Sequence, residues 1–301
     1  MLPVVHNPNY QAPLPQDHRF PMGKFGALAK RLKDDGFAPF HNPTPAPEEW
    51  ITLAHTQEYV DQVFSQTVPR KVAREIGFPM TQEVALRART ACAGTTLTAR
   101  LALEHGIACN TAGGSHHARK EQGAGFCVFN DVAVAIKVLQ ADATIQNALV
   151  IDCDVHQGDG TARIFENDPT VATISIHGAA NYPTRKAVST LDVPLQDGVE
   201  DDVYLSILDD TLDKASIFPA DIVFYNAGVD PHRDDRLGRL ALTNDGIAAR
   251  DRRVIERVRQ WGLPLAGVIG GGYATDVNAL AERHALLHQS ARQSLATQSS
   301  N

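Results

Sequence analysis

The stretch ALVIDCDVHQGDG (residues 148–160) joins an apolar run to a cluster of three aspartates and one histidine. The run ALVI is apolar at every position, as expected of a strand buried on both faces of a parallel sheet. Asp152, Asp154, His156 and Asp159 follow it closely. Like charges crowded at the end of a buried strand are unfavourable unless a positive charge lies among them. The stretch therefore predicts an α/β sheet with a cation at the carboxyl end of this strand.

Similar apolar runs recur along the chain and alternate with segments of helical length. The strand candidates are IACN (107–110), ALVIDCD (148–154), VATISIH (171–177), DIVFYNAG (221–228) and LPLAGVIGGG (263–272). The helix candidates are residues 81–105, 130–140, 202–214, 244–261 and 275–289. This alternation predicts a doubly wound, mostly parallel α/β sheet flanked by helices.

Length and composition set the broad class of the protein. The chain has 301 residues, 43% hydrophobic and 21% charged, with no repeat, linker or break in composition. We therefore expect one domain over residues 1–301, with a disordered tail over residues 294–301. The rival is a boundary at the Pro-rich stretch HNPTPAPEEW (41–50), which we interpret as a surface loop.

The charge and the apolar pattern bear on partners and location. A net charge of −7 gives no basic footprint, so direct nucleic-acid binding is not expected. No apolar run reaches the ~20 residues of a membrane span, and the N-terminus has no signal pattern. The sequence thus predicts a soluble cytoplasmic protein and gives no indication of the oligomeric state.

A metal site in this chain must use histidine and carboxylate ligands. Its four cysteines contain no CxxC pair, which excludes a thiolate zinc site, and a disulfide framework is not expected at this length. Asp154 and His156 stand at i and i+2, so on an extended strand end they project to the same side. Asp230, after another strand, would be the third ligand. One histidine and two aspartates leave positions open, as in catalytic zinc sites.

Two alternatives to this zinc site remain. Iron or cobalt could occupy the same ligands. An isolated D-x-H motif is also more often a capped strand end with solvated carboxylates. The neighbouring motifs favour the metal site.

The segment GGSHHARKEQGAGFCVFND (113–131) places two adjacent histidines after a glycine pair. His116 and His117 are hard to explain as core packing, because each unpaired ring nitrogen would cost about 1–3 kcal/mol. Asp152 and Asp159 could each accept a hydrogen bond from one imidazole Nδ1, which fixes the tautomer and raises the basicity of the outer nitrogen. Two such pairs beside a metal indicate general acid–base chemistry.

The segment GGGY (270–273) presents Tyr273 on a turn that glycine tolerates best. Its phenol could donate a hydrogen bond to a polarised carbonyl oxygen, as an oxyanion donor does. For Tyr273 alone, a core tyrosine with its hydroxyl at the surface is a credible alternative, but the position of Tyr273 at the end of a buried strand, opposite the other motifs, weakens it. The residues expected to line a substrate channel are Gly125, Phe126, Gly271 and Gly272.

These motifs, in this order, resemble the histone deacetylase family. The matching stretches are DHRFPMGKF (17–25), HTQEYV (55–60), GGSHHARKEQGAGFCVFND, VIDCDVHQGDGT (150–161), VFYNAGVD (223–230), DRLGRLALTNDGI (235–247) and GGGY. The stretch from Asn226 to Asp251 is most similar to class IV and its bacterial relatives. The resemblance implies an arginase-like α/β fold with about eight parallel strands, and a zinc-dependent amidohydrolase.

The resemblance also assigns roles to individual residues. It implies one Zn²⁺ held by Asp154, His156 and Asp230. Its tandem histidines match His116 and His117, with Asp152 and Asp159 as partners, and Tyr273 matches its transition-state tyrosine. A potassium ion near the zinc is implied at Asp152, Asp154, His156, Ser175 and Ile176.

A second catalytic metal is not expected. Arginases of the same fold bind two manganese ions through D-x-H-x-D and D-x-D. Gly158 and His232 replace the last aspartate of these two motifs. A second metal would therefore lack hard oxygen ligands.

The implied substrate is an acylated amine, most plainly N-acyl-lysine in a protein or peptide. The class IV likeness suggests long acyl chains, whereas the family in general suggests acetyl. An acylpolyamine or another small amide is the alternative, and a catalytically silent acyl-lysine binding module is the non-enzymatic one. The loop HGAANYPTRKA (177–187) lacks the aromatic of many family members, so the sequence does not identify the channel wall opposite Phe126.

Overall fold

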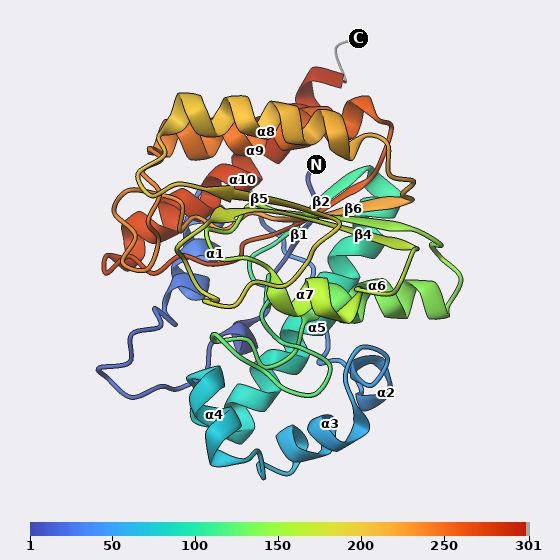
Figure 1. Cartoon of the computed structure of the whole chain (residues 1–301), viewed down its shortest axis with the longest axis vertical. Helices are drawn as coiled ribbons and strands as arrows, with labels where there is room; N and C mark the ends of the chain where they lie inside the picture. Colours follow the sequence, from blue (N-terminus) through green and yellow to red (C-terminus); the bar gives the residue numbers. More distant parts are fainter. Residues whose placement is uncertain (299–301) are drawn as a thin grey trace.

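The computed structural model of the chain describes residues 1–298 (Figure 1). At its centre is a seven-stranded sheet in the order β1-β2-β7-β6-β3-β4-β5, with every neighbouring pair parallel. The strands are β1 (Val4–Val5), β2 (Ile107–Asn110), β3 (Ala148–Asp152), β4 (Val171–Gly178), β5 (Leu191–Leu195), β6 (Ile222–Asn226) and β7 (Leu265–Val268).

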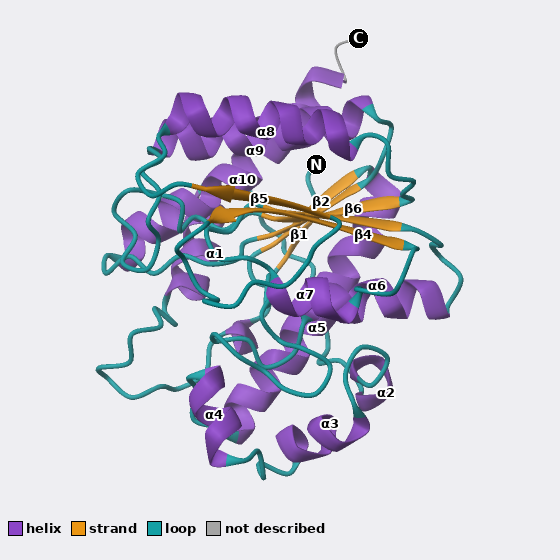
Figure 2. Cartoon of the chain, in the orientation of Figure 1, coloured by secondary structure: helices purple, strands orange, loops and turns teal. Residues whose placement is uncertain are grey.

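Helices cover both faces of this sheet (Figure 2). They are α1 (Lys24–Asp34), α2 (Glu48–Ile51), α3 (Gln57–Phe64), α4 (Arg70–Ile76), α5 (Gln82–His105), α6 (Asp131–Ala141), α7 (Asp159–Ile164), α8 (Asp201–Ala215), α9 (Asn244–Gln260) and α10 (Val277–Gln298), with a 3₁₀ turn at Pro8–Tyr10. Helices α8 and α9 lie on one side of the sheet, and α5, α6 and α7 on the other (Figure 1). The predicted doubly wound α/β architecture is confirmed.

Several helix boundaries follow from local sequence. The side chain of Thr81 accepts a hydrogen bond from the backbone N–H of Val84 at the start of α5, and Gly106 ends that helix in the left-handed region at φ 83°. Asn130 caps α6 in the same way, through the N–H of Ala133. Such caps satisfy backbone groups that a helix end leaves without partners, so they fix where each helix begins and ends.

The structure differs from the expectation at the edges of the sheet and at the C-terminus. Strand β1 has only two residues, too few for a clear apolar run. Strand β5 is half-buried and contains Pro194, which suits an edge strand, so it has no continuous apolar run either. The described residues form seven strands where about eight were expected. Helix α10 continues to Gln298, so residues 294–298 of the expected tail are helical, and residues 299–301 lie outside the described part. A single domain over the chain stays a prediction.

The order of the strands creates a switch point between β3 and β6. From β3 the chain proceeds outward through β4 and β5, then returns to place β6 on the other side of β3. Ligands of open α/β sheets bind in the crevice at the carboxyl ends of such strands. Four adjacent strands, β2, β7, β6 and β3, all end at this edge and lead into the polar motifs. No helix in the described residues is long and apolar enough to cross a membrane.

Candidate metal centre and active site

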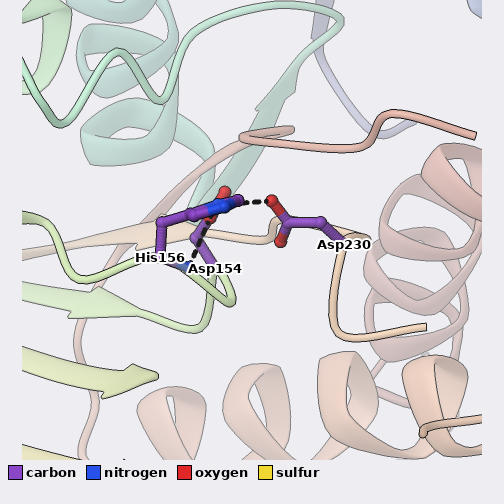
Figure 3. Close-up of side chains that lie close together, drawn as sticks. All are labelled: Asp154, His156 and Asp230. Carbon is purple, nitrogen blue, oxygen red and sulfur yellow. Dashed lines mark hydrogen bonds and ion pairs between the residues drawn. The ribbon is translucent and has the colours of Figure 1, made fainter. Parts of the chain in front are cut away.

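Three buried side chains converge at the switch point (Figure 3). Asp154 and His156 lie on the loop after β3, and Asp230 lies on the loop after β6. The Nδ1 atom of His156 is 3.1 Å from Asp154 Oδ1 and 3.0 Å from Asp230 Oδ2. Within residues 1–298 these three form the one group of metal-ligating side chains whose donor atoms all lie within 4.8 Å of one another. We call them the metal cluster.

The backbone around the metal cluster holds its carboxylates in place. We expected Asp154 and His156 on an extended strand end. Strand β3 instead ends at Asp152, and the two residues lie on a bend that follows it. Asp154 Oδ2 accepts a hydrogen bond from the N–H of Gly271 at 2.6 Å, and Asp230 Oδ1 accepts one from the N–H of Val155 at 2.8 Å. A Cβ on Gly271 would lie 2.1 Å from Asp230 Oδ2, so only glycine leaves room for both carboxylates.

The chemistry of the metal cluster fits a divalent metal. Within the described residues, Asp154 forms ion pairs only with His116 and His156, and Asp230 forms one only with His156. Burial and the nearby Asp154 raise the pKa of Asp230 to about 7. Burial would lower the pKa of His156, but Asp154 and Asp230 raise it to about 10. Both shifts show a site that favours positive charge, and one imidazole with two carboxylates is a catalytic zinc donor set.

Two histidine–aspartate pairs lie beside the metal cluster. His116 Nδ1 is 2.7 Å from Asp152 Oδ2, and His117 Nδ1 is 2.8 Å from Asp159 Oδ1. All four side chains are buried. The structure therefore brings together the partners that the sequence suggested, with each Nε2 left as the outer nitrogen.

The pKa values of the two histidines shift in opposite directions. Burial would lower the pKa of His116, but the carboxylates of Asp152 and Asp154 raise it to about 9. Burial, and then the charge of His116, lower the pKa of His117 to about 4 against the pull of Asp159. At neutral pH the pair is therefore a cation beside a neutral imidazole.

A hollow of about 320 Å³ opens above these residues and is lined by His117, His156, Gly125, Phe126 and Tyr273, among others. His116 is not among its lining residues. Gly125 adopts φ 53°, and a Cβ there would lie 2.6 Å from His117 Cδ2. This glycine lets the backbone approach the histidine closely.

Gly271 and Gly272 are not among the residues that line the hollow, so their place in a substrate channel stays a prediction. They lie behind the wall: the N–H of Gly271 binds Asp154, and Gly272 O accepts a hydrogen bond from Lys24 Nζ at 3.4 Å. Gly271 packs closely against the carboxylates of Asp154 and Asp230, whereas Gly272 packs against Val229, Leu280 and His284.

Tyr273 reaches the hollow from the loop after β7. Its N–H donates to Asp235 Oδ2 at 2.7 Å, and its ring centroid lies 5.8 Å from that of Phe126. Burial, and then Asp154 and Asp230, raise the pKa of the Tyr273 phenol well above its usual range. The hydroxyl therefore stays protonated and can donate a hydrogen bond.

The structure identifies a wall that the sequence did not. The ring of Tyr182 lies edge-on to His117, at 4.8 Å between centroids and an interplanar angle of 87°, and lines the same hollow as Phe126. It is the one aromatic residue in the loop of residues 177–187, and that was the available signal.

Three further residues support the site, and the sequence analysis assigned them no role. Lys24 Nζ donates to Gly270 O at 3.1 Å in the turn before Tyr273. Asn226 Nδ2 donates to Asp152 Oδ1 at 3.0 Å. The buried Arg250 donates from Nη1 to Cys153 O at 3.2 Å and Gly228 O at 2.5 Å, which joins the loops after β3 and β6. Lys24 and Asn226 lie inside the motifs quoted above, and Arg250 lies in the stretch from Asn226 to Asp251, but only the fold shows what they contact.

Gly158 and His232, which stand where a second metal would need aspartates, have other surroundings. A Cβ on Gly158 would lie 2.5 Å from Asp152 Oδ2, and His232 Nδ1 accepts a hydrogen bond from the N–H of Asp234 at 3.1 Å. Ser175 lies beside Asp152 in the β3–β4 register, with its hydroxyl 3.0 Å from His177 Nδ1. The potassium site at Ser175 and Ile176 stays a prediction.

Comparison with known proteins agrees with this geometry. The family model described as histone deacetylase domain matches residues 18–288. Histone deacetylase 2 of Arabidopsis thaliana is 35% identical over 85% of this chain and 70% of its own length. Histone deacetylase 8 of Xenopus laevis is 31% identical over 77% of this chain and 76% of its own. An uncharacterized protein of Picosynechococcus sp. is 48% identical over 96% of this chain and 98% of its own.

A solved structure supports the fold. The crystal structure of the HDA15 HD domain matches with a TM-score of 0.81 at 24% identity, over 95% of this chain and 87% of that one. Fold and family together define a hydrolase that acts on linear amide bonds. The chain belongs to the histone deacetylase family.

Proposed function

We propose that this chain is a zinc-dependent deacylase that removes the acyl group from N-acyl-lysine in a protein or peptide. The observation that carries the proposal is the convergence, at one hollow, of the metal cluster, the neutral His117 and the protonated Tyr273. A binding module would need the hollow but neither a proton acceptor nor a hydrogen-bond donor in its wall.

The metal supplies one part of the chemistry. Zinc held by Asp154, His156 and Asp230 would polarise the acyl carbonyl and lower the pKa of a water molecule from ~15.7 toward 7. The donor atoms of the metal cluster already lie close enough to share one ion. The remaining steps fall to side chains of the chain itself.

His117 is the proposed proton acceptor and donor. Its Nδ1 is hydrogen-bonded to Asp159, so Nε2 is the ring nitrogen left to act on a substrate in the hollow that His117 lines. As water attacks the carbonyl carbon, Nε2 takes the water's proton, and Asp159 stabilises the imidazolium that forms. The same proton then passes to the lysine nitrogen as the C–N bond breaks. The products are a carboxylate and a free amine.

Tyr273 and the aromatic walls position the substrate. The Tyr273 hydroxyl donates a hydrogen bond to the carbonyl oxygen, which gains negative charge as the carbon becomes tetrahedral. The rings of Phe126 and Tyr182 offer apolar walls to the methylene chain of an acyl-lysine. His116, which lies behind His117, sets the charge of the site.

A kinetic series on one lysine peptide, acylated with chains from acetyl to myristoyl, tests the proposal on the zinc-loaded protein. Turnover of at least one member is expected, and Asp154→Ala should lose both activity and most bound metal because one of three ligands is gone. Asp34→Ala, at an exposed aspartate of α1, is the control and should change neither.

Other results would favour the alternatives. Turnover of acylpolyamines or acyl-sugar amides alone would show a small-molecule amidase. Peptide binding without turnover of any amide would show a silent acyl-lysine binding module. Two tightly bound catalytic metals per chain would contradict the single metal cluster.

A further inference from the structure

A second hollow adjoins the one above the metal cluster. It has a volume of about 630 Å³ and is lined by residues 182–188 together with Arg119, Arg163 and Glu166. Tyr182 lines both hollows, so its ring is a shared wall. A peptide whose acyl-lysine enters the first hollow would therefore lay its flanking residues over the second.

The lining of this second hollow is strongly cationic. Its charged side chains are Arg119, Arg163, Arg185 and Lys186, against one acid, Glu166. The chain as a whole carries a net charge of −7, so the cations are concentrated here against the overall balance. We call these four side chains, with Tyr182 and Val188, the basic groove.

Two of the four cationic side chains form no ion pair with a carboxylate in the part of the chain that the structure describes. Arg185 is exposed and forms no ion pair within residues 1–298. Lys186 Nζ donates to the carbonyl oxygens of Asn181 at 2.5 Å and Pro183 at 2.7 Å, which are uncharged acceptors. Arg119 and Arg163 share one carboxylate, Asp159, at 3.5 Å and 3.8 Å. That carboxylate already binds His117, so the groove keeps a net positive charge.

The basic groove also exposes apolar surface. Tyr182 is 42% exposed and Val188 78%, among the few large hydrophobic side chains that reach the surface of the described residues. Cations around exposed aromatic and aliphatic groups are suited to a peptide with acidic residues, since charges steer the encounter and apolar contacts hold it. The charged residues that line the first hollow, besides its histidines, are Arg19, Arg239 and one acid, Glu75, and the guanidinium of Arg19 lies over the Phe126 ring at 5.0 Å.

We propose that the basic groove binds an acidic segment next to the acyl-lysine, so that the preferred substrates are acidic peptides. The inference rests on the proposed deacylase function and narrows its substrate class. Basic tails and polyamines would meet like charge at Arg185 and Lys186, which disfavours both.

Three peptides that share one acyl-lysine core test this inference. Three flanking residues are all Asp, all Ser or all Lys, and kcat/KM is measured at about 0.01 M and about 1 M salt, where the screening length falls from about 30 Å to about 3 Å. At low salt the acidic peptide should exceed the basic one by about tenfold, as expected of a few exposed ion pairs. High salt should remove most of the difference.

A charge reversal in the groove makes the test specific. Arg185→Glu should lower the ratio of acidic to basic kcat/KM by about tenfold or more, because one attraction becomes a repulsion. Arg252→Glu, at an exposed arginine of α9 that lines neither hollow, is the matched control and should leave the ratio unchanged. Fluorescence anisotropy of the same three peptides gives an affinity that does not depend on turnover.

The outcomes separate the two proposals. Turnover of all three peptides at equal rates, or a preference for the basic one, would overturn the acidic-segment proposal and leave the deacylase intact. If none is turned over, the deacylase proposal fails, and anisotropy still decides whether the groove selects acidic peptides. A labelled single-stranded oligonucleotide that binds more tightly than the acidic peptide, and is released by Arg185→Glu, would assign the groove to nucleic acid instead.

Discussion

The pairs His116–Asp152 and His117–Asp159 have the same chemistry and adjacent positions in the chain, yet they face different surroundings. His116 lies behind the wall of the hollow, with its Nε2 3.8 Å from Asp154 Oδ1 and Asn226 beside its Nδ1. His117 lines the hollow, with an aromatic edge from Tyr182 and two arginines behind its aspartate.

Position, and not residue type, shifts the pKa values of these two histidines in opposite directions. Carboxylates on two sides raise the pKa of His116 to about 9, so it is a standing charge. Burial and that charge lower the pKa of His117 to about 4, so it is neutral and able to accept a proton. A bound cation would add repulsion to both.

The largest effect is expected from His117→Ala. Loss of the proton acceptor should lower kcat by about 10³-fold, within the range for general acid–base catalysis, with bound metal unchanged. Steady-state kinetics and metal analysis check this, and His105→Ala, at a half-exposed histidine, is the control. If His116→Ala were the more damaging of the two, the roles assigned here would be reversed.

Tyr273→Phe tests the second side chain in the wall of the hollow to which we assign a role. Both histidine pairs stay intact, and kcat should fall about 10²-fold, the scale for one lost oxyanion donor. The metal content should not change, because the tyrosine is not in the metal cluster. Turnover at the wild-type rate would remove Tyr273 from the mechanism.

His116→Gln should have a smaller effect on rate and a distinct effect on pH dependence. The amide can still bind Asp152, but the positive charge beside His117 is lost, so the pKa of His117 should rise from about 4. Activity requires neutral His117 and falls as the pH drops through that pKa, so the acidic limb of kcat/KM should move to higher pH. We expect a loss of about tenfold in kcat at neutral pH. An acidic limb that stays in place would show that His116 does not act through its charge.

The smallest effect is expected from Gly158→Ala, which acts on the His116 pair through Asp152. Its Cβ would lie 2.5 Å from Asp152 Oδ2, so the carboxylate must shift away from His116. A loss below about tenfold in kcat is expected, with a shift of the acidic limb in the same direction as in His116→Gln. Gly23→Ala, whose Cβ would make an ordinary 3.6 Å contact with Val277, is the control. A loss as large as that of His117→Ala would mean that the two pairs cannot be separated.

Much of the sheet and the site could be predicted because their signals are local. Strand β2 matches the predicted IACN residue for residue, since a buried parallel strand is a continuous apolar run. The polar motifs follow β2, β3, β6 and β7, and strand ends in a parallel sheet share one edge. The metal-cluster residues Asp154 and His156 could therefore be predicted from the sequence, although the bend that joins them could not.

The remainder depends on contacts between distant parts of the chain. Lys24 meets the turn before Tyr273 across 246 positions of sequence, and Tyr182 meets His117 across a loop with no regular structure. Strand β5 is half-buried at the edge of the sheet, so it has no continuous apolar run to announce it. Periodicity in the sequence does not reveal contacts between distant residues, because these contacts form only when the chain folds.

The hydrogen bonds of Arg250 bear on how a metal would enter the proposed site. This side chain is fully buried, is paired with Asp251, and ties the carbonyl of Cys153 to that of Gly228. The two loops that carry the metal cluster are thus braced by the polypeptide, and we expect their arrangement to persist without an ion. Folding and metal loading become separate events: a chelator should strip activity while the circular dichroism of the native fold persists. The identity of the ion that refills the site then follows the supply of metals around the protein.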